Sequence, residues 1–311
     1  MQDVWISRYV DLMFGPKHTF DTMTEAAKLK FQHMPEKLYK YRSFNDYTWD
    51  ALETDTLFVN LTSKQNDKRE ANIIVTHEAE VSVLQQMYDD LRIKYGLPST
   101  SIENPEEFVM VVHDHFRTKA LLKGQVEADL SKMPIFDTIK EDLIRSFNEF
   151  MSGVRRNVRE MYSICCFSAS NNNDLMWAHY AESFSGCCIE YPFKSLGSDH
   201  MHVALMFPAI YVNDNRVYMN YYNPEAGLDG ALGMFAATLK QNKWAYEEEW
   251  RRLYTAADGG KTHSMIKPTA VYMGENIKTS DKQKLTELCN RRGIELYQMV
   301  YDQTSDSIRA I

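Results

Sequence analysis

The chain has 311 residues, of which 44% are hydrophobic and 12% aromatic, and its formal net charge at pH 7 is −8. This hydrophobic content is enough for a buried core, and no repeat or low-complexity segment interrupts it, so we expect a globular protein. The acidic balance argues against a surface that coats nucleic acid, but it leaves room for a local basic groove.

The sequence gives no sign of a membrane or secretory segment. The first eight residues, MQDVWISR, do not join a basic stretch to an apolar run. No apolar run approaches the roughly 18 residues that span a bilayer. We therefore expect a cytoplasmic protein with no membrane partner.

The five cysteines form two adjacent pairs and one single residue, with none of the two-residue spacing of zinc sites. Reduced thiols are typical of the cytosol, and neighbouring residues on a strand point to opposite faces. We predict small buried side chains and no metal site for this set: Cys165, Cys166, Cys187, Cys188 and Cys289.

The N-terminal half divides into three parts. Residues 1–36 read as a helical lead-in that stops before Pro35, and the alternating segments 38–42 and 56–61 are typical of strands. From 77 to 160 the apolar residues recur at helical spacing with charges between them. We therefore predict a large helical insertion over residues 77–160.

The C-terminal half returns to strands. A helix over 281–292 is expected to end at Gly293, in the manner of a C-cap, and further helices are expected at 173–184 and 228–243. The predicted strands are 162–168, 186–191, 204–212, 250–254, 270–273 and 296–301. The fold class that follows is α+β, with a mixed or antiparallel β core formed by residues 37–76 and 161–311.

The segment 244–252, WAYEEEWRR, mixes aromatic and charged residues. Aromatic residues favour burial, whereas Glu and Arg are rarely buried unless paired, so such a segment is typical of a cleft wall. On a strand, Glu247, Glu249 and Arg251 would share one face. A solvated edge strand with weak surface ion pairs is the alternative.

Three further segments combine the same residue types. On a strand, Tyr39 and Tyr41 would share one face and Lys40 and Arg42 the other. We predict that at least three of five aromatic residues line one pocket with Arg42 and Glu249. The three segments are LYKYRSFND at 38–46, LFVNLTSKQND at 57–67 and DLMWAHYA at 174–181. The five aromatic residues are Tyr39, Tyr41, Trp177, Tyr180 and Trp244.

These motifs, together with the strand GCCIEY at 186–191, resemble a bacterial family known as domain of unknown function 2971. The resemblance runs from about residue 38 to 300, and MWAHY and YEEEWR are its specific parts. The usual Asn-Asp-Pro-Phe-Glu turn of the family is replaced by Asn66-Asp67-Lys68-Arg69-Glu70.

The order of motifs also resembles, more distantly, the ADP-ribosyltransferases. That resemblance implies a β core of their type and NAD as substrate. It implies that Glu249 stabilises an oxocarbenium-like transition state, that Glu247 acts on the incoming nucleophile, and that Arg42 orients NAD. The residues implied to bind NAD are Tyr39, Tyr41, Arg42, Ser43, Ser168, Trp177, His179 and Tyr180.

The same resemblance implies a bacterial toxin or anti-phage effector that modifies RNA or a protein, with an antitoxin or another neutralising protein as a partner. If the acceptor is a nucleic acid, an acidic protein must gather phosphates through a confined patch. Lys64, Lys68 and Arg69 are the candidates for that patch.

Other interpretations stay open at this stage. A metal-dependent nuclease could use Asp67, Glu190, Glu247 and Glu249 as Mg²⁺ ligands, and a non-catalytic sensor could bind a nucleotide or peptide in an aromatic cleft. Individually, Arg42 could pair with Asp46 or with a glutamate across the sheet. His179 could be a packed core histidine, and the tryptophans could be hydrophobic anchors.

Overall fold

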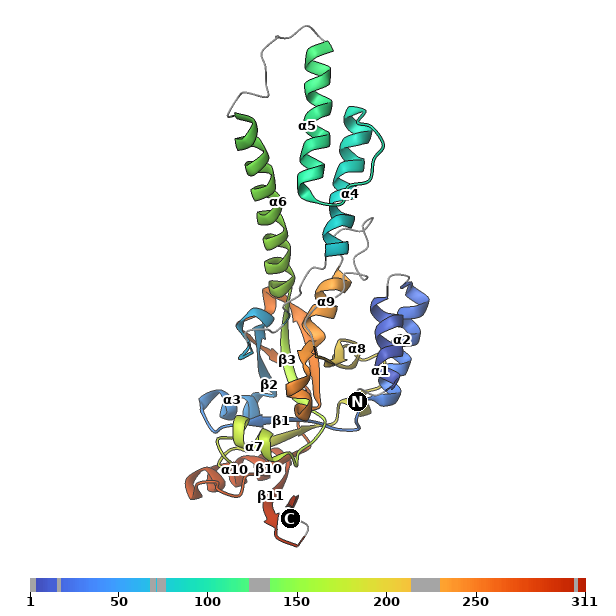
Figure 1. Ribbon diagram of the computed structural model, residues 1–311. Helices are drawn as coiled ribbons and strands as arrows, with labels where there is room; N and C mark the ends of the chain where they lie inside the picture. Colours follow the sequence, from blue (N-terminus) through green and yellow to red (C-terminus); the bar gives the residue numbers. More distant parts are fainter. Residues whose placement is uncertain are drawn as a thin grey trace. The chain divides into compact units, whose positions relative to one another are not determined.

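The computed structural model describes residues 4–15, 18–67, 71, 77–122, 135–213, 230–304 and 307–311. The chain divides into two compact units. The first, which we call the sheet unit, comprises Met1–Ala71, Arg159–Asn215 and Gly233–Ile311. The second, the helical unit, comprises Asn72–Val158 and Arg216–Leu232. Figure 1 labels the elements of both.

The sheet unit is built on one mixed sheet, as the α+β pattern of the sequence predicts. Its central strands run in the order β10, β4, β1, β3 and β2, and these neighbours pair antiparallel. Strand β10 pairs parallel with β11. Strand β8 pairs with β3 and β5, with Glu249 opposite Ser168. The strands are β1 (Leu38–Arg42), β2 (Thr56–Leu61), β3 (Tyr162–Ser168), β4 (Cys187–Tyr191), β5 (Met206–Pro208), β8 (Glu249–Thr255), β9 (Lys261–Ser264), β10 (Ala270–Met273), β11 (Glu295–Asp302) and β12 (Ser307–Ala310).

Helices precede and connect these strands, and side chains cap several of them. Asn45 caps the helix that follows β1 by accepting from the Thr48 amide at 3.0 Å, and Asn173 caps α7 through the Met176 amide at 3.1 Å. The helices are α1 (Val4–Phe14), α2 (Phe20–His33), α3 (Asp46–Thr54), α7 (Asp174–Tyr180), α8 (Met201–Ala204), α9 (Gly230–Thr238) and α10 (Thr279–Arg292). The 3₁₀ turns are η1 (Thr62–Lys64), η3 (Phe193–Leu196), η5 (Asn242–Glu247) and η6 (Ala256–Asp258).

Apolar side chains cover both faces of the sheet. Cys187 belongs to the larger cluster, with Leu38, Ile189 and the helix residue Leu285, whereas its neighbour Cys188 belongs to a second cluster. The cysteines are free, as predicted, and Cys166 is the one described cysteine that is half-buried rather than buried. The alternation of strand side chains therefore produces two buried layers from one sheet.

Two of the predicted elements end earlier than the periodicity suggested. The helix expected over 228–243 ends at Thr238, because the chain turns into the short strand β7 (Leu239–Gln241), which pairs parallel with β6 (Ile210–Val212). The helix expected over 173–184 ends at Tyr180, and Glu182–Phe184 follow with positive φ angles.

The helical unit contains α4 (His77–Tyr95), α5 (Pro105–Leu122) and most of α6 (Ile135–Glu160). Its described core gathers Leu84 and Tyr88 of α4 with Phe108 and Val109 of α5. The Tyr88 hydroxyl donates to the Pro98 carbonyl at 2.6 Å, which ties α4 to the connection that follows it. Among the described helices of the chain, none is long and apolar enough to cross a membrane.

Candidate functional site

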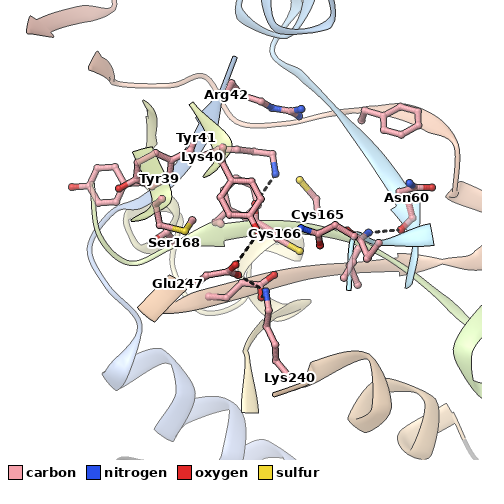
Figure 2. A pocket seen from close by; sticks show the side chains of 18 of the residues that line it. Tyr39, Lys40, Tyr41, Arg42, Asn60, Cys165, Cys166, Ser168, Lys240 and Glu247 are labelled. Carbon is pink, nitrogen blue, oxygen red and sulfur yellow. Dashed lines mark hydrogen bonds and ion pairs between the residues drawn. The ribbon is translucent and has the colours of Figure 1, made fainter. Parts of the chain in front are cut away.

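A cavity of about 360 Å³ lies in the sheet unit. Its walls come from β1, the end of β2 with η1, β3, α7, β7 and the start of β8 (Figure 2). Three of the five aromatic residues predicted to share one pocket with Arg42 and Glu249 line this cavity, namely Tyr39, Tyr41 and Tyr180.

Two buried carboxylates form one wall. The strand predicted over 250–254 is present as β8, which begins at Glu249, but the strand geometry considered for all of 244–252 fails before that residue, because residues 242–247 form the 3₁₀ turn η5. Glu248, between them, has a left-handed backbone with φ of 46°. Even so, Glu247 and Glu249 meet, because the Lys240 ammonium bonds the Glu247 carboxylate and also the Glu249 carboxylate, the latter at 2.6 Å.

Arg251 supports this acidic wall without lining the cavity, because it is fully buried. Its Nη2 donates to Glu249 Oε2 at 3.0 Å, and its Nη1 donates to the Ala237 carbonyl at 2.6 Å. Burial alone would raise the pKa of the Glu249 carboxyl, but the charges of Arg251 and Lys240 and the hydrogen bonds outweigh burial and hold that pKa well below its usual range. Glu249 is therefore ionised at neutral pH.

Lys240 is the site residue that sequence reasoning missed. It lies within the segment predicted as a helix, where a lysine reads as a solvated side chain. In the structure it lies on β7 and is only 8% exposed. A buried lysine is rarely tolerated without partners, and the two nearby glutamates are the sequence signal that could have identified it.

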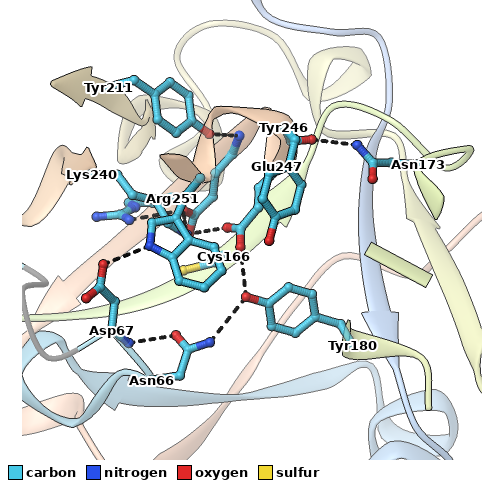
Figure 3. A network of polar contacts seen from close by, with 12 residues as sticks. Asn66, Asp67, Cys166, Asn173, Tyr180, Tyr211, Lys240, Tyr246, Glu247 and Arg251 are labelled. Carbon is cyan, nitrogen blue, oxygen red and sulfur yellow. Dashed lines mark hydrogen bonds and ion pairs between the residues drawn. The ribbon is translucent and has the colours of Figure 1, made fainter. Parts of the chain in front are cut away.

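A chain of hydrogen bonds extends from Glu247 to the segment that follows η1 (Figure 3). The Tyr180 hydroxyl donates to Glu247 Oε1 at 2.8 Å, and Asn66 Nδ2 donates to that hydroxyl at 3.2 Å. Burial, followed by the Glu247 charge, raises the pKa of Tyr180, so its hydroxyl stays protonated. Beside this chain, the Trp244 indole donates to Asp67 Oδ2 at 2.9 Å.

Two basic side chains form the wall that belongs to β1. The Arg42 side chain is half-buried, and its Nε is buried without a hydrogen-bond partner. Arg42 makes no ion pair with Asp46 or with any other residue that the structure describes. Lys40 donates to the Cys166 carbonyl at 2.6 Å and lies 5.3 Å from the centre of the Phe167 ring.

The exposed side chain of Lys64, on η1, adds a third cation to this cavity. Lys240 and Arg251 offset the two carboxylates, so the excess charge of the cavity is positive and lies on the β1 and η1 side. Lys68 and Arg69, the other two members of the predicted phosphate patch, and Glu70 lie outside the described residues.

The predicted NAD-binding residues divide into two groups. Tyr39, Tyr41, Arg42, Ser168 and Tyr180 line the cavity together with Glu247 and Glu249. Ser43, Trp177 and His179 are not part of its lining.

Each of these three exceptions has a structural reason. Trp177 is fully buried, packs edge-on against the Tyr41 ring at 5.3 Å and donates to the Asn171 carbonyl at 2.8 Å. It is therefore a core anchor. His179 is exposed on α7, so neither a cavity role nor the alternative of a buried core histidine holds for it. The Ser43 hydroxyl accepts from Asn45 Nδ2 at 3.4 Å, and the Ser43 carbonyl accepts from Thr48, at the start of α3.

The four carboxylates of the nuclease alternative do not meet as one group. Glu190 accepts from Thr269 and from Tyr272, both at 2.7 Å, and pairs with Lys37 at 2.8 Å. Asp67 is bonded to Trp244. Within the described ranges, no group of three or more His, Cys, Asp or Glu residues could hold a metal ion.

The fold and site therefore define an α+β protein whose mixed sheet carries a charged, aromatic cavity. A family model described as "Protein of unknown function (DUF2971)" matches residues 176–252. The match includes Tyr180, Lys240, Glu247 and Glu249, and over these residues it supports the resemblance to that family. Comparisons with curated proteins and with solved structures gave no match.

Proposed function

We propose that the protein is an NAD-dependent ADP-ribosyltransferase. One observation carries this proposal: a single cavity holds two buried carboxylates on one wall and the Arg42 guanidinium, without an ion pair to any described residue, on another. Cleavage of a dinucleotide at its ribose needs both an anion at the reacting carbon and a cation for the pyrophosphate.

The basic wall is suited to the phosphates of the donor. A guanidinium forms paired hydrogen bonds with phosphate oxygens, and Arg42 has donors to spare. The rings of Tyr39 and Tyr41 offer apolar contact to nicotinamide. The volume of about 360 Å³ is towards the lower end of ligand sites. The cavity therefore encloses the reacting end of NAD and leaves the adenosine end outside.

The acidic wall is suited to the bond that breaks. Nicotinamide leaves as a neutral molecule with the electron pair of the C1′–N bond, and positive charge develops on the ribose. The ionised Glu249 carboxylate opposes that charge. Without substrate, the Lys240 ammonium offsets the negative charge of both carboxylates. Productive binding of NAD therefore requires this ammonium to turn from one carboxylate towards a substrate oxygen. Glu247, held by Tyr180, remains to take a proton from the acceptor.

Arg42→Gln is expected to weaken NAD binding by about 10-fold to 100-fold, because a charge-assisted contact to phosphate is lost. The dissociation constant is to be measured by calorimetry, and the rate of nicotinamide release by chromatography. Arg291→Gln is the matched control, since Arg291 is an exposed arginine on α10 that pairs with Glu53. An Arg42→Gln protein that binds and cleaves NAD like the Arg291→Gln control would contradict the role of Arg42.

Nicotinamide release also separates the three classes of function. A transferase releases nicotinamide from NAD whether or not EDTA is present. A metal-dependent nuclease cleaves nucleic acid and loses that activity in EDTA. A non-catalytic sensor gains thermal stability from its ligand without turnover. The role as a toxin or anti-phage effector, and the neutralising partner, stay predictions.

A further inference from the structure

A second cavity, of about 460 Å³, lies on the other side of the Glu247–Glu249 turn. Glu249 belongs to the lining of both cavities. The second cavity lies within the sheet unit, and its walls come from α1, the end of α2, β5, β6, η5 and the start of β8. The proposed NAD chemistry leaves this cavity without a role.

Stacked aromatic rings form one wall of this second cavity. The Trp5 ring of α1 stacks on His33 of α2, with centroids 4.5 Å apart and planes within 2°. It also stacks on Trp250 of β8, with centroids 6.5 Å apart and an interplanar angle of 20°. Trp5 is half-buried and His33 exposed, so the stack is partly open to solvent. Such a wall suits a flat group or a cation.

The charge of the second cavity is the opposite of the first. Its lining contains no lysine or arginine, and because Lys240 and Arg251 offset Glu249, its excess charge is that of Glu248. The Glu248 side chain is exposed, and its left-handed backbone is fixed because its amide donates to the Ala245 carbonyl while its own carbonyl accepts from Ala169 at 2.9 Å. A residue other than glycine in this conformation is uncommon, and such residues cluster at functional sites.

We propose that the second cavity binds the guanidinium group of an arginine side chain. A guanidinium is planar, always protonated, stacks on aromatic faces and forms paired hydrogen bonds with a carboxylate. The aromatic wall and the exposed Glu248 carboxylate match these properties. A phosphate backbone would instead meet the exposed Glu248 carboxylate and no lysine or arginine in the lining, which favours a protein ligand over RNA.

The proposed function adds a chemical role to this site, because Glu249 lines both cavities. The bound arginine is then the acceptor of ADP-ribose. One guanidinium nitrogen forms a bond to C1′ of NAD, while the C1′–N bond to nicotinamide breaks and its electron pair leaves on the neutral nicotinamide. The proton released from the guanidinium passes to the Glu247 carboxylate, while Glu248 holds the guanidinium. This acceptor role rests on the proposed function, whereas the binding site does not.

The binding site is tested without NAD, by titrating Nα-acetyl-arginine amide and following tryptophan fluorescence and NMR chemical shifts. Nα-acetyl-citrulline amide, the neutral isostere, is the matched ligand. We expect saturable binding of the arginine compound alone. We expect Glu248→Gln to weaken that binding by about threefold to tenfold, as for a partly exposed charge-assisted contact. Glu275→Gln, which changes an exposed glutamate outside the cavity lining, should leave it unchanged.

Several outcomes would overturn the inference. The first is that the arginine compound shows no saturable binding, or that the citrulline compound binds as tightly. The second is that Glu275→Gln weakens binding as much as Glu248→Gln does. The third is that a short single-stranded RNA displaces the arginine compound from the same site. Nicotinamide release is measured in parallel. If arginine binds but NAD is not cleaved, the arginine site is supported and the transferase proposal is contradicted. If NAD is cleaved but arginine does not bind, the transferase proposal is supported and the arginine site is contradicted.

Discussion

Glu249→Gln should reduce the rate of nicotinamide release by on the order of 100-fold or more, because the variant loses the anion that opposes charge on the ribose. The same change should also lower stability, since Glu249 is 5% exposed and holds both Lys240 and Arg251. Breaking a buried ion pair costs about 3 to 5 kcal/mol. Rates must therefore be expressed per folded molecule, at a temperature where circular dichroism shows an intact fold.

Glu190→Gln is the matched control for this prediction. Glu190 is 1% exposed, lies on the same sheet and has a lysine partner and two hydroxyl donors, but it does not line the cavity. The Glu190→Gln variant should be less stable than the wild type but should release nicotinamide at the wild-type rate per folded molecule. If both variants lose the same fraction of activity, Glu249 is a structural residue and the transferase proposal loses its central carboxylate.

Lys240→Met should destabilise the protein by about 3 to 5 kcal/mol at neutral pH, because the two buried carboxylates would then keep Arg251 as their one charged partner among the described residues. Urea unfolding, followed by fluorescence, measures this change. Adding Glu247→Gln to Lys240→Met removes the like charge and leaves the Glu249–Arg251 pair. The double variant should therefore be more stable than Lys240→Met alone by on the order of 1 to 3 kcal/mol.

The pH dependence of the Lys240→Met effect follows from the pKa shifts. In the wild type the depressed pKa of Glu249 contributes stability above about pH 4, and that stability is lost as the pH falls through the folded-state pKa. Without Lys240, burial and the nearby carboxylate raise the pKa of Glu249 relative to the wild type, so the penalty appears only as the pH rises above about 4. The stability difference between the two proteins should be largest near pH 7 and shrink below pH 4. A difference independent of pH, or a double variant no more stable than Lys240→Met, would contradict the account of Lys240.

Local sequence patterns were sufficient to predict the fold class and several residues of the cavity. The alternation in 38–42 predicts β1, and the adjacent cysteines at 187 and 188 do lie on opposite faces of β4. Tyr39, Tyr41, Arg42 and Tyr180 could be assigned to one pocket because each lies in a segment that mixes aromatic and charged residues. These are properties of short stretches, where the period of the side chains determines their face.

The remaining features depend on tertiary contacts that a short pattern does not contain. Glu247 reaches Glu249 through a 3₁₀ turn and the left-handed Glu248, not through strand alternation. Lys240 joins them only because the predicted helix ends at Thr238 and β7 pairs with β6. The sequence leaves Trp177 either as a pocket residue or as a hydrophobic anchor, and the Tyr41 ring and the Asn171 carbonyl fix it in the core. Propensity is overridden at each of these positions by long-range pairing.

A crystal structure of the Glu249→Gln variant with NAD tests the central claim most directly, because reduced turnover should preserve the intact dinucleotide. We expect the pyrophosphate within about 3.2 Å of the Arg42 guanidinium and the nicotinamide ribose beside the side chain at position 249. We also expect the Lys240 ammonium to have turned from at least one of its present partners. NAD bound away from this cavity, or a cavity that stays empty at saturating NAD, would contradict the account.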